Sequence, residues 1–144
     1  MATVREILAR KGPEVVTAVP DSTVMEAAQL MNARGIGAVP VVESGALIGI
    51  FTERDLMRRV VAEGLDPREV RLRQVMTPDP LTARVETPVT ECGALMTARR
   101  IRHLPVLGPA GLIGIVTIGD LMAFQVADQA DTIAQLNSYV YDVR

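Results

Sequence analysis

The chain is a tandem duplication. Residues 17–62 align with residues 82–127 at a constant offset of 65 without a gap, and 21 of the 46 aligned pairs are identical. The longest identical runs are Leu47-Ile48-Gly49-Ile50 with Leu112-Ile113-Gly114-Ile115, and Asp55-Leu56-Met57 with Asp120-Leu121-Met122. Two units of one small fold most simply pack about a pseudo-two-fold axis, each covering the apolar face of the other. Any site at the seam between the units is therefore expected in two related copies.

Length and apolar content favour one body with a shared core. The chain has 144 residues. A unit of about 60 residues alone would bury only about 60% of its unfolded surface. Hydrophobic residues make up 49% of the chain, and most are aliphatic. This excess predicts a core between the units together with a surface for self-association, so a homodimer is expected.

Charge, hydropathy and cysteine content argue against several classes of function. The net charge of −2 argues against a nucleic-acid surface. Apolar runs such as Leu47–Phe51 are far too short to cross a bilayer, and the first residues lack the apolar stretch of a signal peptide. Because Cys92 is the single cysteine, no internal disulfide can form, which predicts a cytoplasmic location.

Both units predict the order strand, helix, strand, strand, helix. In the first unit we expect strand Val15–Val19, helix Val24–Ala33, strands Gly37–Val42 and Leu47–Phe51, and a helix from Thr52. In the second unit we expect strand Leu81–Val85, helix Val89–Ala98, strands His103–Leu107 and Leu112–Val116, and a helix from Thr117. Thr23 and Glu26 have capping-box spacing, and Thr87-Pro88 places a cap residue before a proline at the first helical position.

Further helices flank the two units. Residues 4–11 correspond to residues 69–76 at the same offset, so each unit is expected to begin with a short helical lead-in. Residues 126–143 predict an amphipathic tail with an apolar stripe of Ile133, Leu136, Tyr139 and Val140. Packing of this stripe against the module or a second copy is the favoured interpretation, and a partner-binding helix is the alternative.

The pattern Thr-x-x-Asp recurs at both strand-to-helix junctions, as Thr52 with Asp55 and Thr117 with Asp120. A threonine cap with a carboxylate three residues later is an ordinary capping box. A ligand site is the alternative interpretation, because a helix N-terminus offers free amides. A carboxylate there can also accept hydrogen bonds from two vicinal hydroxyls, as on a ribose.

The second repeated feature is a proline inside a predicted strand, at Pro40 and Pro105. A proline lacks the backbone donor, so it belongs at a strand edge or start, where the backbone can pair with a planar group such as a purine edge. The units differ just before these prolines, where Gly35, Gly37 and Ala38 are matched by Arg100, Arg102 and His103. The basic residues suit a phosphate site, with a solvated strand end as the alternative.

The chain offers few groups for catalysis. His103 is the single histidine, and Cys92 lies within a helix among small and apolar residues, where packing is the favoured role. The sequence contains no His/Cys cluster with metal spacing, no phosphate-binding loop with a Gly-Lys-Ser/Thr ending and no Gly-x-Ser-x-Gly motif. We therefore expect no enzymatic activity.

These residues resemble the cystathionine-β-synthase (CBS) family, and the whole chain is similar to a tandem CBS pair, or Bateman module. The resemblance rests on Val39-Pro40-Val41, Leu47–Ile50 and Thr52-x-x-Asp55-Leu56, and on their partners Leu104-Pro105-Val106, Leu112–Ile115 and Thr117-x-x-Asp120-Leu121. It implies an α/β (α+β) fold of two βαββα repeats packed with pseudo-two-fold symmetry and flanked by N- and C-terminal helices. The expected segments are a lead-in helix at 1–13, CBS motifs at 14–72 and 79–127, and a C-terminal helix at 128–144.

The resemblance also implies two clefts for adenosine ligands. One cleft would comprise Thr17, Ile36, Gly37, Ala38, Pro40, Thr117 and Asp120. The other would comprise Thr52, Asp55, Thr82, Ile101, Arg102, His103 and Pro105, with Arg54 as a possible phosphate contact. The aspartates would hold ribose hydroxyls, the threonines the ribose or the α-phosphate, and the backbone at 36–38 and 101–103 the adenine edge. Because Arg102 and His103 are basic, we expect the Asp55 cleft to be the better phosphate site.

The expected function is a non-catalytic regulatory module that binds AMP, ADP or ATP and passes the cellular energy state to an unidentified regulated protein. Two alternatives stay open: a partner-binding scaffold with vestigial clefts, and a sensor of NAD(H) or S-adenosylmethionine. A nucleotide hydrolase that uses one aspartate as a base is disfavoured, because no nucleophile or metal site accompanies it. No obligatory cofactor or metal is expected.

Overall fold

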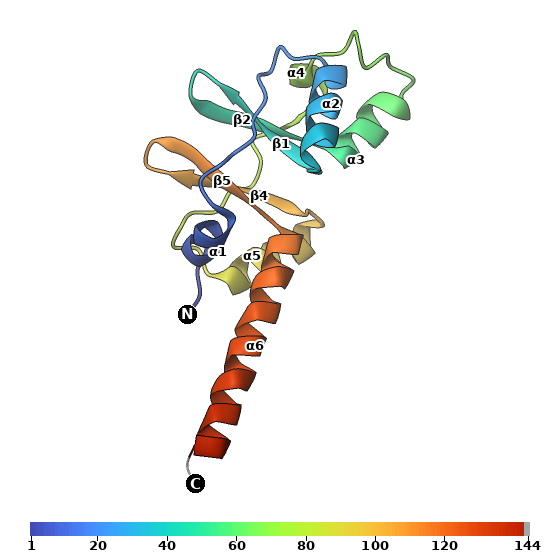
Figure 1. The fold of residues 1–144 in the computed structure, drawn as a ribbon. Coiled ribbons are helices and arrows are strands. Elements are labelled where there is room, and N and C mark those ends of the chain that lie inside the picture. Colours follow the sequence, from blue (N-terminus) through green and yellow to red (C-terminus); the bar gives the residue numbers. More distant parts are fainter. Residues whose placement is uncertain (143–144) are drawn as a thin grey trace.

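Each repeat is built around a two-stranded antiparallel hairpin (Figure 1). The computed structural model describes the secondary structure of residues 1–142 and the burial of side chains up to residue 138. In the first repeat β1 (Ala38–Glu43) pairs with β2 (Ala46–Thr52), and in the second β4 (His103–Gly108) pairs with β5 (Gly111–Thr117). The register shifts after Val41 in one hairpin and after Val106 in the other, at equivalent positions. The four hairpin strands confirm the predicted ones to within one residue at each end.

The predicted first strand of each repeat is wrong. Val15–Val19 and Leu81–Val85 each form only an isolated parallel bridge, Ala18 with Val41 and Ala83 with Val106. The reason is the turn that follows at once: the amide of Ser22 donates to the oxygen of Val19, and Pro20 removes the next donor. Each bridging segment still crosses its hairpin, and so it adds one residue of pairing without becoming a strand.

The first helix of each repeat packs on its hairpin. Helix α2 (Val24–Arg34) begins with the predicted capping box, in which the amide of Glu26 donates to Thr23 Oγ1 at 3.1 Å. Helix α5 (Val89–Arg99) begins differently from the prediction, because the N-cap is Pro88 and not Thr87. Pro88 has extended backbone angles and lies outside the helix, where its carbonyl accepts from the first turn.

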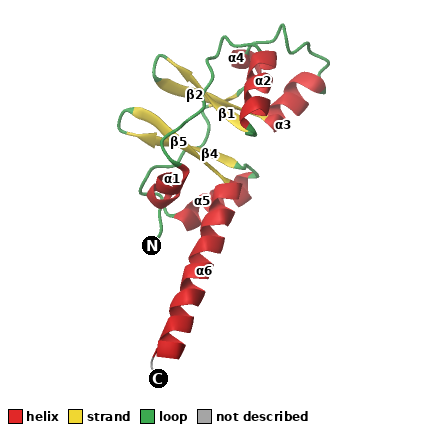
Figure 2. Ribbon diagram, viewed as in Figure 1, coloured by secondary structure: helices red, strands yellow, loops and turns green. Residues whose placement is uncertain are grey.

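The second helices of the two repeats differ in length (Figure 2). In the first repeat the short helix α3 (Glu53–Asp55) continues as a π-helical turn, Leu56–Val61, and a turn at Gly64 follows. In the second repeat α6 (Ile118–Asp142) runs for 25 residues without a break, because no glycine or proline follows Gly119. The predicted tail is therefore part of the repeat's own helix. Its stripe residues Tyr139 and Val140 lie outside the residues whose side chains are described.

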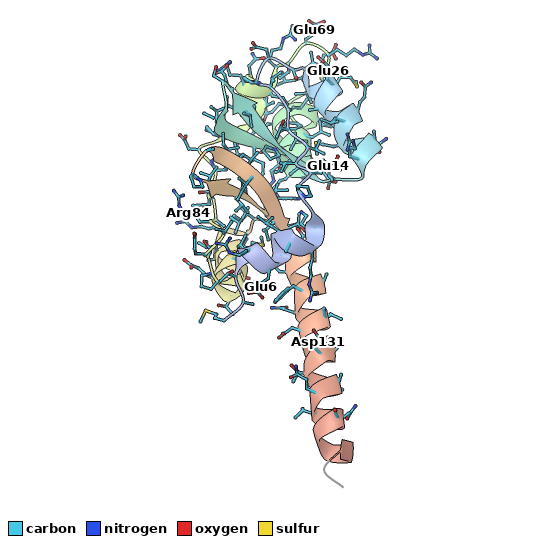
Figure 3. The ribbon with its side chains drawn as sticks, turned by 60° about the vertical axis from the view of Figure 1, so that its left-hand side comes forward. Glu6, Glu14, Glu26, Glu69, Arg84 and Asp131 are labelled. Carbon is cyan, nitrogen blue, oxygen red and sulfur yellow. The ribbon has the colours of Figure 1, made fainter. Side chains whose placement is uncertain are left out.

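The outer part of α6 extends away from the body of the protein. Figure 3 shows Asp131 on the segment of α6 that lies beyond the strands and the other helices. The apolar side chains of Val126, Ile133 and Leu136 are each more than half exposed on this helix. The predicted packing of the stripe against the module is therefore wrong for the residues described, and the face is left uncovered within one chain.

The lead-in helices are exchanged between the repeats. Helix α1 (Val4–Lys11) buries Val4 and Ile7 in the core of the second repeat. The short helix α4 (Leu72–Val75) buries Leu72 and Val75 in the core of the first. After α4 the chain forms β3 (Thr77–Pro78), which pairs with β2. Because each lead-in completes the core of the other half, the two repeats are tied together, and β2 also contacts β5 across the seam.

The two lead-ins are aligned differently from the prediction. The N-cap of α1, Thr3, pairs with Pro88, and the N-cap of α4, Arg71, pairs with Thr23. Since Pro88 and Thr23 are 65 residues apart and the two caps are 68 apart, the lead-ins match at an offset of 68. Helix α1 has eight residues and α4 has four, so α1 carries one additional turn.

Candidate functional site

A cavity of about 590 Å³ lies at the seam of the two repeats. The first repeat contributes the end of β2 and the start of the following helix, and the linker contributes the segment from Thr77 to Leu81. The second repeat contributes the end of α5 and the residues that lead into β4. A cavity of this size is within the range of small-molecule sites.

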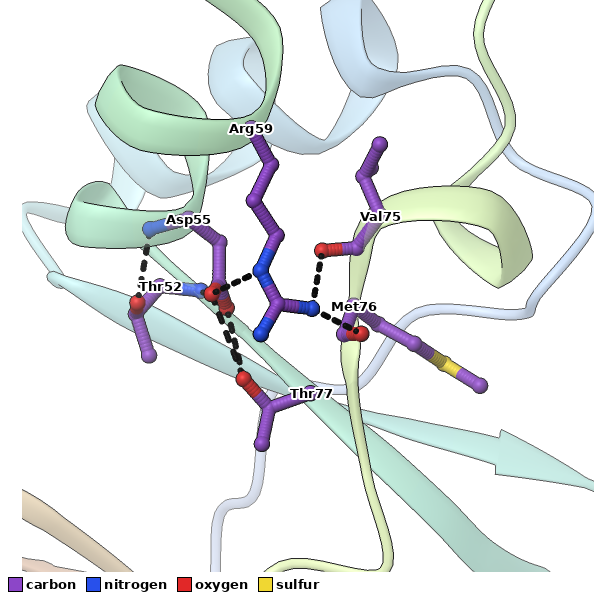
Figure 4. A network of polar contacts seen from close by, with 6 residues as sticks. All are labelled: Thr52, Asp55, Arg59, Val75, Met76 and Thr77. Carbon is purple, nitrogen blue, oxygen red and sulfur yellow. Dashed lines mark hydrogen bonds and ion pairs between the residues drawn. The ribbon is translucent and has the colours of Figure 1, made fainter.

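The polar centre of this cavity is Asp55, whose side chain is buried (Figure 4). Asp55 Oδ2 accepts from the amide of Thr52 at 3.0 Å, and the amide of Asp55 donates to Thr52 Oγ1 at 3.1 Å. The hydroxyl of Thr77 donates to both carboxylate oxygens, at 3.2 and 3.4 Å. The capping box therefore exists as predicted, and it fixes the carboxylate at the wall of a cavity.

Arg59 holds the same carboxylate from the side of the helix. Its Nε lies 3.6 Å from Asp55 Oδ1, and its Nη1 donates to the oxygens of Met76 at 2.8 Å and Val75 at 3.3 Å. The guanidinium thus joins the second helix to the linker behind the carboxylate (Figure 4). A buried carboxylate held by three groups keeps its orientation, which is what recognition of a hydroxyl pair requires.

Arginines dominate one wall of the cavity. Arg99, Arg100 and Arg102 come from the second repeat and Arg54 from the first. Arg54 Nη1 donates to the oxygen of Arg100 at 2.8 Å and so connects the two repeats across the cavity. Arg100 has a left-handed backbone with φ of 54°, at the position where α2 ends with Gly35 at φ of 63°. An arginine in this conformation is strained relative to glycine, and such strain concentrates at functional sites.

His103 lies where the two repeats meet, next to Gly37 of the other hairpin. Burial lowers the pKa of its imidazole below the ordinary value of 6.5. The carboxylates of Glu53 and Asp120 oppose this shift, and Lys11 and Arg102 add to it. The imidazole is therefore neutral at pH 7 and is a hydrogen-bonding group there, whereas the sequence pattern had favoured a cation.

The cavity brings together most of the residues predicted for the Asp55 cleft. Those that line it are Thr52, Arg54, Asp55, Ile101, Arg102 and His103. Pro105 is buried within its hairpin, opposite Ile115, and neither it nor Thr82 lines the cavity. Gly37, which the family resemblance assigns to the other cleft, lines this one because its oxygen accepts from the amide of Glu53.

The residues predicted for the other cleft are arranged differently. Thr117 and Asp120 repeat the capping box, with Asp120 Oδ2 accepting from the amide of Thr117 at 2.9 Å. The same oxygen lies 2.8 Å from Lys11 Nζ. Ala38 and Pro40 are buried and Ile36 is half-buried. Thr17 lines a separate cavity of about 340 Å³ together with residues of α2, and neither Thr117 nor Asp120 lines this cavity.

Three groups around the aspartates were missed by the sequence analysis. Thr77 lies in a linker that was expected to be irregular, Arg59 is four residues after Asp55 on the same helix, and Lys11 comes from a lead-in assigned to the first repeat. The i, i+4 spacing of Asp55 and Arg59 is a sequence signal that would have found that pair. The other two depend on the exchange of lead-in helices, for which the sequence has no local signal.

Comparison with known proteins settles the family. The CBS domain family matches residues 4–62 and 72–127. This chain belongs to the CBS domain family. It is 33% identical over 147 residues to the mitochondrial CBS domain-containing protein CBSX3 of Arabidopsis thaliana, covering 96% of this chain and 71% of the relative.

Solved structures of CBS proteins share most of the fold. A protein with CBS domains from Burkholderia ambifaria MC40-6 superposes with a TM-score of 0.85 at 39% identity, covering 89% of this chain and 96% of the other. The CBS domain pair of protein MJ0100, in complex with 5′-methylthioadenosine and S-adenosyl-L-methionine, superposes with a TM-score of 0.78 at 26% identity, covering 89% and 98%. The chain is thus a CBS pair, which is a regulatory type of module.

Within residues 1–142 no three histidine, cysteine, aspartate or glutamate side chains lie close enough to hold a metal ion. In the same part of the chain, no helix combines the length and the apolar character that crossing a membrane requires.

Proposed function

We propose that this CBS pair is a non-catalytic sensor that binds an adenosine nucleotide in the cavity beside Asp55. The observation that carries the proposal is a cavity of about 590 Å³ that combines an oriented, buried carboxylate with a wall of arginines. A carboxylate suits the vicinal hydroxyls of a ribose, and arginines suit phosphates. A nucleotide carries both partners, because it has vicinal hydroxyls on its ribose and at least one phosphate.

The carboxylate has capacity left for a ribose. An ionised carboxylate offers about four acceptor positions. The amide of Thr52 uses one at 3.0 Å, and the hydroxyl of Thr77 makes two longer contacts at 3.2 and 3.4 Å. A ribose hydroxyl can therefore bind beside the Thr52 amide, and a second one can replace the shared contact with Thr77. Arg59 stays behind the carboxylate, with its Nε 3.6 Å from Oδ1, and holds it in position.

The backbone beside the cavity supports recognition of adenine. The amide of Ile101 donates to the oxygen of Met96, and the oxygen of Arg102 accepts from the amide of Ile118. Among the described hydrogen bonds, this leaves the oxygen of Ile101 as an acceptor and the amide of Arg102 as a donor. The amino group and a ring nitrogen of adenine form the complementary pair on one base edge. Both residues line the cavity.

The number of arginines favours AMP, ADP or ATP over a ligand without phosphate. Arg99, Arg100 and Arg102 line the cavity from the end of α5 and the short segment that leads into β4. A relative, the CBS pair of MJ0100, binds 5′-methylthioadenosine and S-adenosyl-L-methionine, which share the adenosine part. S-adenosylmethionine, which carries no phosphate, is therefore the principal alternative ligand, and NAD(H) is another. The arginine wall supports a phosphate-bearing ligand over S-adenosylmethionine.

A ligand panel with matched variants tests the proposal. AMP, ADP, ATP, NAD(H) and S-adenosylmethionine are compared by thermal shift, and the best ligand is titrated calorimetrically into the wild type and two variants. A ligand at about 100 times Kd adds roughly 2.7 kcal/mol to the free energy of unfolding. Asp55→Asn should weaken binding roughly 10- to 100-fold, the value of a charge-assisted hydrogen bond or two. The equivalent change Asp120→Asn is the matched control and should leave this affinity within about twofold.

Two outcomes would contradict the proposal. If no adenosine ligand shifts the melting temperature at millimolar concentration, the clefts are vestigial and the chain is a partner-binding scaffold. If ATP or NAD with Mg²⁺ is converted to product by wild-type protein and by neither aspartate variant, the chain is an enzyme. Absence of product together with binding at Asp55 agrees with a sensor.

A homodimer belongs to the same proposal. Met57 and Val61 on the second helix of the first repeat match Met122 and Val126 on α6, and all four are more than half exposed. We infer that these equivalent positions form one apolar face, which a second copy can cover with its own identical face. Met122→Glu should convert a dimer to a monomer in analytical ultracentrifugation, and Gln135→Glu, at an exposed position on the opposite side of the same helix, should not. A wild-type monomer at 100 μM would contradict this part.

We infer from the position of the cavity how ligand binding would be transmitted to a regulated protein. A ligand changes an equilibrium only through different affinities for two states. The cavity lies at the seam of the repeats, where Arg54 and Arg100 connect them. A bound nucleotide would fix the relation of the two repeats and thereby the face presented to a partner.

A further inference from the structure

The two equivalent aspartates have different partners. Asp55 is contacted on the cavity side by the neutral hydroxyl of Thr77, and Arg59 reaches it from its own helix. At Asp120, the position of Arg59 is occupied by Phe124, and the cation comes instead from α1. Lys11 Nζ lies 2.8 Å from Asp120 Oδ2 and donates to the oxygen of Ile115 at 2.7 Å.

The additional turn of α1 produces this difference. Leu8 packs against Gly114 of β5, just as Met76 packs against the equivalent Gly49 of β2. After Met76 the chain becomes extended and pairs with β2 as β3. After Leu8 the helix instead continues to Lys11, the last residue of α1. The ammonium group is thus carried to Asp120 by a rigid helix.

The ammonium lies against the same groups that face the open cavity in the other repeat. Ile50 and Asp55 line the Asp55 cavity, and their equivalents are Ile115 and Asp120. Both of these equivalents contact Lys11 Nζ. An ammonium has three donors and no acceptor. Lys11 therefore donates to the Asp120 carboxylate, as a pair of ribose hydroxyls would do. The side chains are 31% exposed for Lys11 and 22% for Asp120, so the contact is only partly screened by water.

We propose that Lys11 decides which cleft takes ligand, by occupying the hydroxyl-recognition position of the Asp120 cleft as an internal substitute. The chain then binds one adenosine ligand, beside Asp55, although its sequence carries two copies of the motif. This inference rests on the proposed nucleotide function and goes beyond it in assigning the stoichiometry to one side chain. A ligand reaches Asp120 only in the fraction of molecules in which Lys11 has left, so its apparent affinity falls by that fraction.

Calorimetric titration with AMP tests the inference in four forms of the full chain. The wild type should bind one AMP per chain. Lys11→Ala should bind two, with affinity for the second site raised about tenfold or more. Lys11→Arg keeps the charge and should bind one. Arg10→Ala is the matched control, because it removes a positive charge from the same turn, where Arg10 stacks over Phe124 at 5.2 Å, and it should also bind one.

The location of the added site is checked in the Lys11→Ala background. A further Asp120→Asn change should remove the added site, whereas Asp55→Asn should remove the original one. Two sites in the wild type, or no added site in Lys11→Ala with unchanged circular dichroism, would overturn the role of Lys11. If the wild type binds no AMP and Lys11→Ala binds one at Asp120, the proposed function of the Asp55 cleft fails while the inference about Lys11 holds.

Discussion

Gly114 on β5 provides the sharpest test of how α1 is docked. A Cβ added there would lie 2.8 Å from Cδ2 and 3.4 Å from Cδ1 of Leu8. Carbon atoms pack best at about 3.5–4.0 Å, so one of the two groups must move. Leu8 can rotate at its end, but its helix is held by Val4 and Ile7, which are 0% and 2% exposed in the core.

Gly114→Ala should therefore lower the free energy of unfolding by about 1–3 kcal/mol, the cost of overpacking a well-filled core. For a chain of this size this is a decrease in melting temperature of roughly 3–10 °C. Urea unfolding followed by far-ultraviolet circular dichroism measures it, with the slope against urea unchanged because the surface exposed on unfolding is the same.

Gly93→Ala is the matched control for that experiment. Gly93 lies in the middle of α5, and its added Cβ would lie 3.9 Å from Leu121 Cδ1, an ordinary contact. Alanine in a helix interior is better than glycine by about 0.5–1 kcal/mol, so this variant should be more stable. If Gly114→Ala is as stable as the wild type while Gly93→Ala gains as expected, α1 does not pack on β5 as described.

Three further predictions concern single positions. Arg100→Gly should stabilise the fold by about 0.5–1 kcal/mol, because glycine adopts φ of 54° freely, and Gly35 has a similar φ at the equivalent helix end. The same change should weaken nucleotide binding. A lower free energy of unfolding in urea would show that Arg100 is not strained. Burial lowers the pKa of His103 in the folded chain below 6.5. As pH falls through 6.5, the imidazole is therefore protonated in the unfolded chain before it is protonated in the folded chain. The free energy of unfolding should thus decrease from pH 7.5 to 6.0 by at most about 1.4 kcal/mol per pH unit, and His103→Ala should remove that slope. Burial, with a smaller effect of Glu91, raises the pKa of the Cys92 thiol; a disulfide reagent should react with it slowly in buffer and fast in 8 M urea, and equal rates would contradict its burial.

The repeat unit was predictable because its signals are local. The hairpin strands Ala38–Glu43 and His103–Gly108 follow from short apolar runs bounded by turn residues, and the caps at Thr23 and Thr52 follow from spacing. The segment around Ala18 was wrongly predicted as a strand, because the apolar run that suggests one is cut short by the turn at Pro20.

The contact of Lys11 with Asp120 was not predictable, because it depends on the tertiary exchange of the lead-in helices. The sequence alone aligns Lys11 with Met76, whereas the folded chain shifts this register by three residues. Core packing around Val4 and Leu72 decides whether a lead-in packs on its own repeat or on the other one. No sequence motif indicates this choice. The Thr-x-x-Asp capping boxes are the same in both repeats, and the additional helical turn of α1 makes their surroundings different.

A crystal structure of the full chain grown with saturating AMP tests the central claim most directly. We expect one nucleotide per chain in the cavity beside Asp55, with the ribose hydroxyls on the carboxylate, adenine against Ile101 and the phosphate toward the arginine wall, while Lys11 stays on Asp120. An empty cavity at saturation, or a ribose bound to Asp120 with Lys11 displaced, would contradict the account.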